Sequence, residues 1–378
     1  MLDYGWCKRI GLGEIYDKVE AGGRLSLEDG ERLFECPDIL AVGALAHRVR
    51  ERLHGSATYY VMNQHINYSN VCVNGCLFCA FGREEDDPLA FQLSLQDILD
   101  KVRARMDDPI TEIHIVGGCH PKLPFSFYES VLREIKALRP SAFIKAFTAV
   151  EIAHFAREEG VSTAEILRRL KDVGLNMLPG GGAEVFSPRI RKRLCPGKLD
   201  GEGWLRVARE AHEMGIKTNA TMLYGHIETY QERIEHMDAL RKLQDATGGF
   251  VCFIPLPFQP DNTKVHGVKP TTGVDDLRNT AVSRLMLDNI PHIKAYWVML
   301  TVKLAQAALY FGADDFDGTV IEEKIGHMAG AQSDQALTRS ELERIIRDAG
   351  LTPVERNCFF EPVQHNGGNH SKDQRPGR

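Results

Sequence analysis

The sequence lacks any long apolar run and any surplus of positive charge. No stretch approaches the roughly 20 consecutive apolar residues that a membrane-spanning helix needs, and residues 1–12 carry charges but no apolar core of a signal peptide. The formal net charge of the 378 residues is −6, which argues against a surface for nucleic acid or for an anionic membrane. We therefore expect neither a nucleic-acid partner nor a membrane partner.

A disulfide framework is missing as well. The sequence has nine cysteines, an odd number, and three of them fall within residues 72–79. This is not the pattern of a disulfide-stabilised secreted domain. A reducing compartment, here the cytoplasm, fits this usage better. A hydrophobic fraction of 43% and a charged fraction of 26% are typical of a globular protein. The remaining cysteines are most simply free thiols: Cys7, Cys36, Cys119, Cys195, Cys252 and Cys358.

The most informative motif is a group of three cysteines, Cys72, Cys76 and Cys79, with the spacing C-x3-C-x2-C. Three thiolates are one ligand too few to complete a tetrahedral zinc site or to saturate a four-iron cluster. The next cysteine along the chain is Cys119, so a cluster held by this loop would keep one iron open for a ligand that is not protein. A zinc knuckle completed by a distant histidine and a chance grouping of buried thiols stay open as alternatives. No C-x2-C partner or H-x3-5-H pair supports the zinc alternative.

The order of apolar and polar segments predicts an α/β fold. Residues 1–57 are expected to form an N-terminal helical extension, with a capping box at Ser26–Asp29. From residue 58 to 364, roughly eight strand-like segments, the first at Ile66–Val71, alternate with helices. This alternation favours a parallel (β/α) TIM-type barrel in one domain. The polar, glycine-rich residues 365–378 are expected to be disordered.

Barrel enzymes place their chemistry at the carboxyl ends of the strands. Polar or glycine-rich motifs follow six of the predicted strands, so the sequence predicts that one mouth of the barrel carries all of them. These motifs are Cys72–Cys79, Gly117–His120, Thr148–Glu151, Gly180–Glu184, Tyr224–His226 and Pro255–Phe258.

Several of these motifs have both a functional and a purely structural interpretation. Gly117–Gly118 permits a close backbone approach that a Cβ atom would block, but a tight strand-to-helix turn needs the same residues. Thr148 and Glu151 suit ligand hydroxyl groups, yet Glu151 is also explained as a first-turn carboxylate of a helix. Glu184 follows Gly180–Gly182, which lacks the lysine and the spacing of phosphate-binding loops. It is either a polar group facing the mouth or a plain carboxylate at a helix N-terminus.

Cationic and histidine side chains accompany the same predicted mouth. The stretch Arg189–Lys198 is usually explained as a solvated helix face, although a guanidinium such as that of Arg191 can bind a carboxylate through two hydrogen bonds. His120 and His226 follow predicted strands and are either structural histidines or substrate contacts. As a group these residues favour a dicarboxylate or polyhydroxyl substrate.

The cysteine loop resembles that of the radical S-adenosylmethionine (SAM) superfamily. The resemblance implies a 4Fe–4S cluster on the three loop cysteines, with an open iron that chelates the amino and carboxylate groups of SAM. It also implies that one electron from the cluster releases a 5′-deoxyadenosyl radical from SAM. The implied SAM contacts are Phe78 near the adenine, Gly117 and Gly118 at the methionine ammonium, and Thr148 and Glu151 at the ribose.

Beyond the loop, residues from about 63 to 358 resemble one subfamily, the aminofutalosine synthases of the futalosine route to menaquinone. Gly75 departs from the family pattern, in which a basic residue is expected, and it loosens the loop without touching the cluster ligands. The segments that carry the resemblance are Asn70–Asn74, Cys79–Phe81, His114–Gly118, Lys145–Ile152, Leu178–Glu184, Ala220–His226, Phe253–Leu256, Asp288–Trp297, Asp317–Thr319 and Glu322–Ile325.

This family resemblance implies a particular radical transferase reaction. The adenosyl radical adds to the vinyl carbon of 3-(1-carboxyvinyloxy)benzoate, and aryl migration with loss of CO2 or bicarbonate gives 6-amino-6-deoxyfutalosine, so SAM is a co-substrate. The expected partners are this small molecule and an external electron donor of flavodoxin or ferredoxin type, with a homodimer left open. No residue is assigned as a catalytic acid or base. The expected substrate contacts are His120, Glu184, Arg191, His226 and Lys294.

Two rival interpretations stay open at this point. A sister radical SAM enzyme, such as a cyclic dehypoxanthinylfutalosine synthase or a deazaflavin-forming synthase, would abstract hydrogen and release free 5′-deoxyadenosine. A non-catalytic iron–sulfur or zinc-binding module would bind metal without cleaving SAM.

Overall fold

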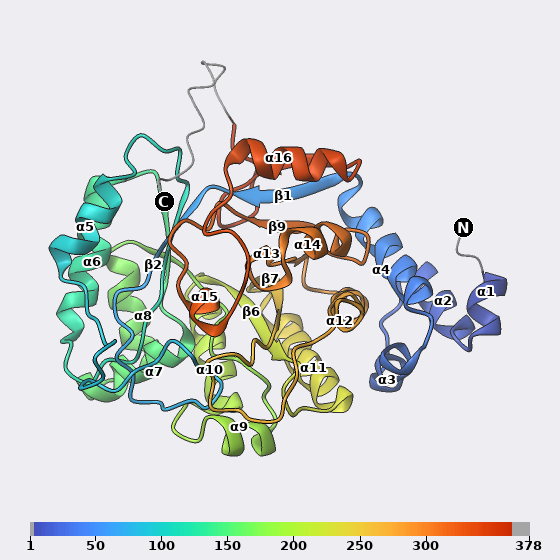
Figure 1. Cartoon of the computed structure of the whole chain (residues 1–378), viewed down its shortest axis with the longest axis horizontal. Coiled ribbons are helices and arrows are strands. Elements are labelled where there is room, and N and C mark those ends of the chain that lie inside the picture. The colour runs from blue at the N-terminus through green and yellow to red at the C-terminus, as the bar shows by residue number, and fades with distance from the viewer. Residues whose placement is uncertain (1–3, 365–378) are drawn as a thin grey trace.

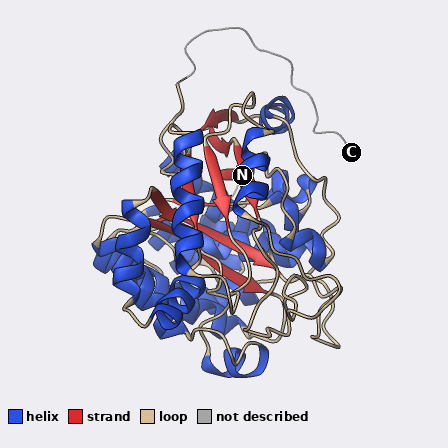
Figure 2. Cartoon of the chain, turned by 90° about the vertical axis from the view of Figure 1, so that its left-hand side faces the viewer, coloured by secondary structure: helices blue, strands red, loops and turns tan. Residues whose placement is uncertain are grey.

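The centre of the molecule is a curved parallel sheet of seven strands that follow one another in chain order. The computed structural model describes residues 4–364, so the tail expected to be disordered lies outside the described residues. Helices cover the outer face of the sheet (Figure 1, Figure 2). The strands are β2 (Asn63–Ile66), β3 (Glu112–Ile115), β4 (Phe143–Ala146), β5 (Leu175–Leu178), β6 (Lys217–Tyr224), β7 (Phe250–Pro257) and β8 (His292–Ile293).

The segment around β9 (Asp315–Gly318) is hydrogen-bonded to both edges of this sheet. At one edge the Asp314 N–H donates to the Ile293 carbonyl at 3.0 Å, and at the other the His65 N–H donates to the Ile321 carbonyl at 2.8 Å. Residues 314–321 therefore connect β8 to β2 and close the ring. The expectation of a parallel α/β barrel is confirmed, with its last strand attached through isolated bridges.

A second, three-stranded parallel sheet joins the beginning of the barrel to the end of the described chain. Its order is β10–β1–β9, with β1 at Ala57–Val61 and β10 at Thr352–Glu355. Helix α16 (Arg339–Asp348) packs on it, above β1 in Figure 1. The inner residues of this layer form their own apolar core around Trp297 and Phe316, both of them fully buried.

Helices alternate with the barrel strands, and most of these helices begin at a residue whose polar side chain caps the first turn. Ser94 and Asp97 form a capping box at the start of α5, and Thr148 and Glu151 form one at the start of α7. Such caps satisfy backbone N–H groups at the first turn. The helices of the barrel are α5 (Leu95–Arg103), α6 (Phe125–Leu138), α7 (Ala149–Glu159), α8 (Thr163–Asp172), α9 (Pro188–Leu194), α10 (Gly201–Glu213), α11 (Tyr230–Thr247), α12 (Gly273–Met286), α13 (Trp297–Leu300), α14 (Val302–Ala308) and α15 (Ile325–Ala329).

In the described chain, four helices precede the first strand, and they lie on the right of Figure 1. The capping box expected at Ser26–Asp29 is confirmed, because the Asp29 N–H donates to Ser26 Oγ and the Asp29 carboxylate accepts the Ser26 N–H. Helices α3 and α4 pack against α12, and α3 also packs against α11, so this region lies against the helical layer of the barrel. The helices are α1 (Tyr4–Arg9), α2 (Gly13–Glu20), α3 (Leu27–Glu35) and α4 (Ile39–His54).

The first barrel strand ends earlier than expected. Strand β2 ends at Ile66, and residues 67–71 are irregular although fully buried. The side chains of Ser69 and Asn70 explain this, because they donate hydrogen bonds to the carbonyls of Phe91 and Leu89 at 2.8 and 2.9 Å. Such side-chain hydrogen bonds compete with the regular backbone hydrogen bonds of a strand. In the described part of the chain, no helix is long and apolar enough to cross a membrane.

Candidate active site

The three-cysteine loop follows β2 and is closed at its base by backbone hydrogen bonds. The Cys72 N–H donates to the Arg83 carbonyl at 3.0 Å, and the Arg83 N–H donates to the Asn70 carbonyl at 2.8 Å. Gly75 has φ of +56° with open space around it, which lets the chain turn between Cys72 and Cys76. Glycine at this position, where a basic residue was expected, therefore suits the backbone conformation of the turn.

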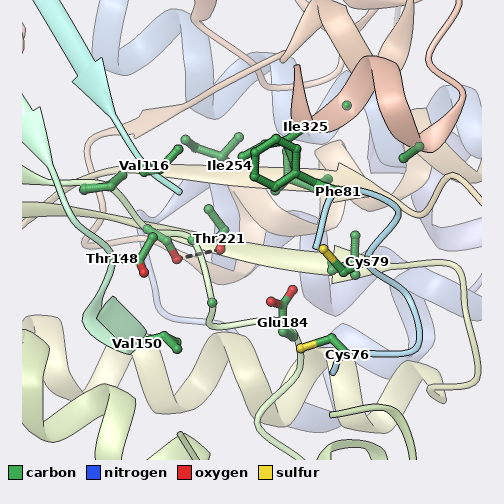
Figure 3. A pocket seen from close by; sticks show the side chains of 18 of the residues that line it. Cys76, Cys79, Phe81, Val116, Thr148, Val150, Glu184, Thr221, Ile254 and Ile325 are labelled. Carbon is green, nitrogen blue, oxygen red and sulfur yellow. Dashed lines mark hydrogen bonds between the residues drawn. The ribbon is translucent and has the colours of Figure 1, made fainter. Parts of the chain in front are cut away.

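The loop thiols are half-buried and line one cavity of about 330 Å³. In Figure 3, Cys76 and Cys79 lie on one side of this cavity, across from Thr148 and Val150. None of the described cysteines forms a disulfide. Three convergent thiols at a cavity wall fit a 4Fe–4S cluster held by three protein ligands.

Hydrogen-bond donors contact the thiols of Cys72 and Cys79, whereas contact with the Cys195 thiol and burial raise the pKa of Cys76. The Gly82 N–H donates to Cys79 Sγ at 3.2 Å. The Cys72 sulfur is contacted by the Cys119 thiol and by the backbone N–H groups of Asn74 and Cys119, and the thiol contact contributes most to lowering the pKa of Cys72 to about 5. Because cluster ligands bind as thiolates, these donors match the chemistry that the residues are expected to supply.

The paired glycines after β3 pack so closely on the cysteine loop that no side chain fits. A Cβ atom on Gly117 would lie 2.6 Å from the Tyr68 ring, and one on Gly118 would lie 2.1 Å from the Val71 carbonyl oxygen. The Gly118 N–H donates to the Ser69 carbonyl at 2.8 Å. Both glycines line the cavity, so their close approach shapes the cavity wall as well as the turn.

Glu151 holds this glycine turn in place. One of its oxygens accepts the Gly117 N–H at 3.1 Å and the Tyr68 hydroxyl at 2.7 Å, and the other accepts the N–H and hydroxyl of Thr148. Glu151 is 1% exposed, and burial raises its pKa to about 7. Both carboxylate oxygens are thus engaged inside the protein, which favours the helix-cap interpretation of Glu151 over a direct ligand contact.

Phe78 and Glu184 also reach the cavity, as expected from the sequence. Lys198 links them, because its Nζ lies 5.3 Å from the Phe78 ring centroid and 2.5 Å from Glu184 Oε1. Of the glycines before Glu184, Gly180 packs against β6, where a Cβ atom on it would lie 2.7 Å from the Ala220 carbonyl carbon. Gly180 therefore serves close strand packing, in addition to lining the cavity.

The five expected substrate contacts separate into two groups. Glu184 and Lys294 line the cavity, and Lys294 Nζ lies 2.6 Å from Asp317 Oδ1. His120, Arg191 and His226 are absent from the described lining residues.

Each of these three side chains has a hydrogen-bond or ion-pair partner within the protein. His120 Nδ1 accepts the backbone N–H groups of residues 122 and 123. Arg191 donates to the backbone carbonyls of Ala183 and Leu199, and His226 Nδ1 lies 2.7 Å from Glu228 Oε2. The cationic stretch forms α9, and Arg191 points into the protein rather than to a solvated face.

A row of polar side chains inside the barrel was not identified from the sequence. His65, His114 and Lys145 are paired across β2, β3 and β4 and all line the cavity. The His65 and His114 rings stack with centroids 4.5 Å apart, and burial lowers the pKa of His114 well below its usual value. On β6, Asn219 Oδ1 is buried and meets no hydrogen-bond partner in the described chain. The sequence pattern that could have identified these residues is the two-residue alternation of each strand, in which every second side chain points to the same face.

Apolar side chains and α15 complete the cavity. Ile325 of α15 and Phe81, which follows the cysteine loop, both line the cavity, and they overlap in the view of Figure 3. The α15 segment is held by Glu323, whose carboxylate accepts the Gly326 N–H at 2.9 Å and pairs with His327. The hydrogen bond with the Glu323 carboxylate raises the pKa of His327. The apolar wall is formed by Leu223, Ile254, Leu256, Phe258 and Met299.

A closed parallel barrel with three cysteines on the loop after its first strand defines a radical SAM protein. Residues 66–240 match the family model of the radical SAM superfamily, and residues 247–367 match that of the CofH/MqnC C-terminal region. The solved structure of methylornithine synthase (PylB) has the same fold, with a TM-score of 0.72 at 16% identity over 89% of this chain and 96% of that one.

Two curated relatives are named aminodeoxyfutalosine synthase. The chain is 49% identical to that of Thermus thermophilus over 93% of this chain and 95% of the relative, and 44% identical to that of Streptomyces coelicolor over 92% and 93%. A 5-amino-6-(D-ribitylamino)uracil–L-tyrosine 4-hydroxyphenyl transferase of Methanopyrus kandleri is 39% identical over 94% and 98%. The chain belongs to the aminodeoxyfutalosine synthase family of radical SAM enzymes.

Proposed function

We propose that this chain is an aminodeoxyfutalosine synthase that binds a 4Fe–4S cluster through Cys72, Cys76 and Cys79 and leaves one iron open for SAM. The observation that carries the proposal is the set of three thiols on one loop, half-buried, two of them supplied with N–H donors and all facing one cavity. The 49% identity to a synthase over nearly the whole of both chains supports the choice of reaction. When bound, the cluster supplies the electron that releases the 5′-deoxyadenosyl radical from SAM.

The cavity wall next to the loop is proposed as the SAM site. Phe78 offers an apolar ring for the adenine. The backbone of Gly117–Gly118 allows a closer approach than a residue with a Cβ atom would permit. Thr148 lines the same wall, where it could meet the ribose. We assign Glu151 to positioning of the glycine turn, because its four hydrogen-bond donors come from the protein itself.

The inner part of the barrel is proposed as the site of 3-(1-carboxyvinyloxy)benzoate. Lys145 and Lys294 are each paired with an acidic residue, and within the described residues the His114 ring stacks on His65 without a hydrogen-bond partner. A neutral imidazole N–H and the two ammonium groups are donors suited to carboxylates. We therefore propose this row in place of Arg191 and His226 as the contacts for the two substrate carboxylates.

The protein's own contribution is to hold two reactants together and to exclude water. Adding the adenosyl radical to the vinyl carbon requires near-attack distance and no strong acid or base. The apolar wall and the α15 segment limit access of solvent and of stray hydrogen donors to the radical. Aryl migration and loss of CO2 or bicarbonate then give 6-amino-6-deoxyfutalosine.

An anaerobic turnover with product identification tests this function. The cluster is reconstituted, and SAM, a strong reductant and 3-(1-carboxyvinyloxy)benzoate are added before mass spectrometry of the adenosine-containing products. We expect an adenosyl adduct that lacks one carboxyl group. Free 5′-deoxyadenosine that is unaffected by the benzoate would move the assignment to a hydrogen-abstracting relative. An intact cluster without SAM cleavage would overturn the radical SAM function of this chain.

We further propose a cytoplasmic enzyme that receives its electron from a flavodoxin or ferredoxin. The absence of disulfides among the described cysteines is typical of a reducing compartment and supports this location. Reduction of the reconstituted cluster by either protein under anaerobic conditions tests the donor, and failure of both would exclude this class of donor.

We also propose that the chain divides into an N-terminal extension at residues 1–57 and a barrel at residues 58–364.

A further inference from the structure

Leu77, between two of the proposed cluster ligands, is hydrogen-bonded to two separate segments. The Leu77 N–H donates to the Leu194 carbonyl at 2.8 Å, and the Leu77 carbonyl accepts the Lys264 N–H, also at 2.8 Å. Leu194 ends α9, and Lys264 belongs to the loop after β7. Gly197 also packs on the cysteine loop, because a Cβ atom on it would lie 3.1 Å from the Asn74 carbonyl oxygen. The end of α9 and the loop after β7 therefore flank the proposed ligands.

Three exposed cations lie on these two segments. Lys192 and Arg193 are in the last turn of α9, which lies at the lower edge of the molecule in Figure 1, and Lys264 is in the loop after β7. Among residues 4–364, none of the three side chains has an ion-pair partner. Their positive charge is therefore presented to the surroundings of the protein.

The other cations of residues 189–198 are engaged inside the protein. Arg189 Nη2 lies 2.6 Å from Glu232 Oε2, and Lys198 Nζ lies 2.5 Å from Glu184 Oε1. The Arg191 guanidinium donates to backbone carbonyls. These contacts hold α9 in place and leave the positive charge in its last turn without a counter-charge in the described chain.

The cysteine loop between these cations reaches the surface. Val73 is 49% exposed, and Gly75 is exposed as well. The whole chain has a formal net charge of −6, so the positive group beside the loop is a local reversal of the overall sign. A short apolar and cationic surface next to the proposed cluster is thus accessible to another protein.

An acidic stretch, residues 84–87, follows the same loop on its other side in sequence. Glu85 Oε2 lies 2.6 Å from Lys122 Nζ. The other carboxylates of the stretch include those of Glu84 and Asp86, which are exposed. Like charges repel an acidic partner from this stretch, and the cations attract it to the α9 side of the loop. The charge distribution therefore favours one orientation of such a partner.

We propose that Lys192, Arg193 and Lys264 form the docking surface for the acidic face of a flavodoxin-type electron carrier. The inference rests on the cluster and donor of the proposed function and is independent of the substrate. Opposite charges speed the encounter of two proteins and orient them. A carrier that leaves after each transfer suits a small contact area of this kind. One electron leaves the reduced carrier and enters the cluster, and no bond forms or breaks in this chain.

Charge reversal at the three positions tests this surface. One triple variant carries Lys192→Glu, Arg193→Glu and Lys264→Glu, and a second triple variant has glutamine at the same positions, which only neutralises the charge. Each reconstituted protein is mixed anaerobically with a reduced flavodoxin that has an acidic face, and the change in cluster absorbance gives the rate constant. Binding of oxidised flavodoxin to the oxidised protein is measured by calorimetry at low and at high salt.

The matched control makes the same change of net charge elsewhere. It carries Arg9→Glu, Arg133→Glu and Lys303→Glu, at exposed positions of α1, α6 and α14. A loss in this control equal to that in the reversed variant would overturn the proposal, because the overall charge would then set the rate.

We expect charge reversal to lower the second-order rate constant of reduction about tenfold or more, and neutralisation to lower it less. Binding of oxidised flavodoxin should weaken in the same order. Both differences should shrink at high salt, because salt screens exposed charges. Equal rate constants and affinities in the reversed and unsubstituted proteins would overturn the proposal, as would a flavodoxin that neither binds nor reduces the unsubstituted protein.

A small neutral reductant, photoreduced deazariboflavin, separates docking from damage to the site. It should reduce all the proteins at the same rate. Slower reduction of the reversed variant by this reductant would overturn the docking role, because the substitutions would then act on the cluster itself. A wrong assignment of the reaction would appear as a missing adenosyl adduct with the small reductant, and it would leave flavodoxin binding and its salt dependence unchanged.

Discussion

The Tyr68 hydroxyl donates to Glu151 at 2.7 Å, and the same carboxylate oxygen accepts the Gly117 N–H at 3.1 Å. Three segments that are distant in sequence meet at this carboxylate: the exit of β2, the glycine turn after β3 and the first turn of α7. The Tyr68 hydroxyl also donates to the Gly118 carbonyl at 3.0 Å. The position of the proposed SAM wall therefore depends on one buried side chain.

Glu151→Ala is expected to loosen that wall. The substitution leaves the N–H groups of Gly117 and Thr148 without their acceptor, and each buried unsatisfied group costs about 1–3 kcal/mol. We expect a lower free energy of unfolding and weaker SAM binding, measured by denaturant titration and by calorimetry on the reconstituted protein. Glu134→Ala, at an exposed position on α6, is the control. Unchanged SAM affinity in Glu151→Ala would contradict the positioning role.

Gly118→Ala and Gly75→Ala should have opposite outcomes. A Cβ on Gly118 would lie 2.1 Å from the Val71 carbonyl oxygen, and backbone must move to admit it. At Gly75 no atom lies within 4 Å, so alanine meets only the strain of a positive φ, about 1 kcal/mol. We expect Gly118→Ala to lose iron on reconstitution and Gly75→Ala to retain it, as iron and sulfide analysis will show. Full iron in Gly118→Ala would mean that the turn can shift without harm.

Arg191→Ala should reduce stability without weakening substrate binding. Its guanidinium bonds the backbone carbonyls of Ala183 and Leu199, which would lose their donors. We expect destabilisation of about 2–6 kcal/mol, from about 1–3 kcal/mol for each carbonyl that loses its donor. The Michaelis constant for the benzoate substrate should stay the same in the folded fraction. A large increase in that constant at unchanged stability would restore Arg191 as a substrate contact.

His114→Leu should weaken binding of the benzoate substrate specifically. The ring lines the cavity, and burial lowers its pKa, so it is a neutral donor at pH 7. Loss of one hydrogen bond to a carboxylate costs about 1.5–3 kcal/mol, which is tenfold or more in the Michaelis constant. SAM cleavage measured without the benzoate should be unaffected. His266→Leu, at an exposed position, is the control, and equal constants in both variants would exclude His114 from the substrate site.

His212 should make the protein less stable in mild acid. Its nitrogens lie 2.7 and 2.9 Å from the hydroxyls of Thr247 and Thr218, and burial lowers its pKa to about 4. Between pH 4 and 6.5 the unfolded chain therefore binds a proton that the folded chain does not, so stability rises with pH over that range and is constant above it. The full difference is about 3 kcal/mol.

Denaturant midpoints measured from pH 4 to 8 will test this dependence. In His212→Gln the contribution of His212 to the slope below pH 6.5 should vanish, while the exposed substitution His266→Gln should keep it. An unchanged slope in His212→Gln would show that other groups cause the acid sensitivity.

The sequence was sufficient for features that depend on local pattern. The cysteine spacing, the glycine pair and the capping box at Ser26 all act within a few residues, and each lies where it was expected. Alternating strands and helices likewise predicted the barrel, because a parallel strand needs a crossover helix.

Features that depend on contacts between distant segments were not predicted. Arg191 was a candidate clamp because of its charge, but the turn of α9 directs it at backbone carbonyls. No role was predicted for His65 and His114, which lie in short strands, although their cross-strand pairing puts both rings in the cavity. The contact of Cys119 with Cys72 joins the ends of two different strands, and spacing along the chain carries no information about it.

The parallel pairing of β1 with β10 has a consequence for synthesis of the chain. Ala57 is paired with Thr352, so β1 leaves the ribosome 295 residues (352 minus 57) before this partner exists. At about 5–20 residues per second, its edge stays open for roughly 15–60 s in every molecule made. An open edge invites pairing with another chain. A chain that ends before Thr352 would keep this edge permanently, and we expect light scattering to show its aggregation where the full chain stays dispersed.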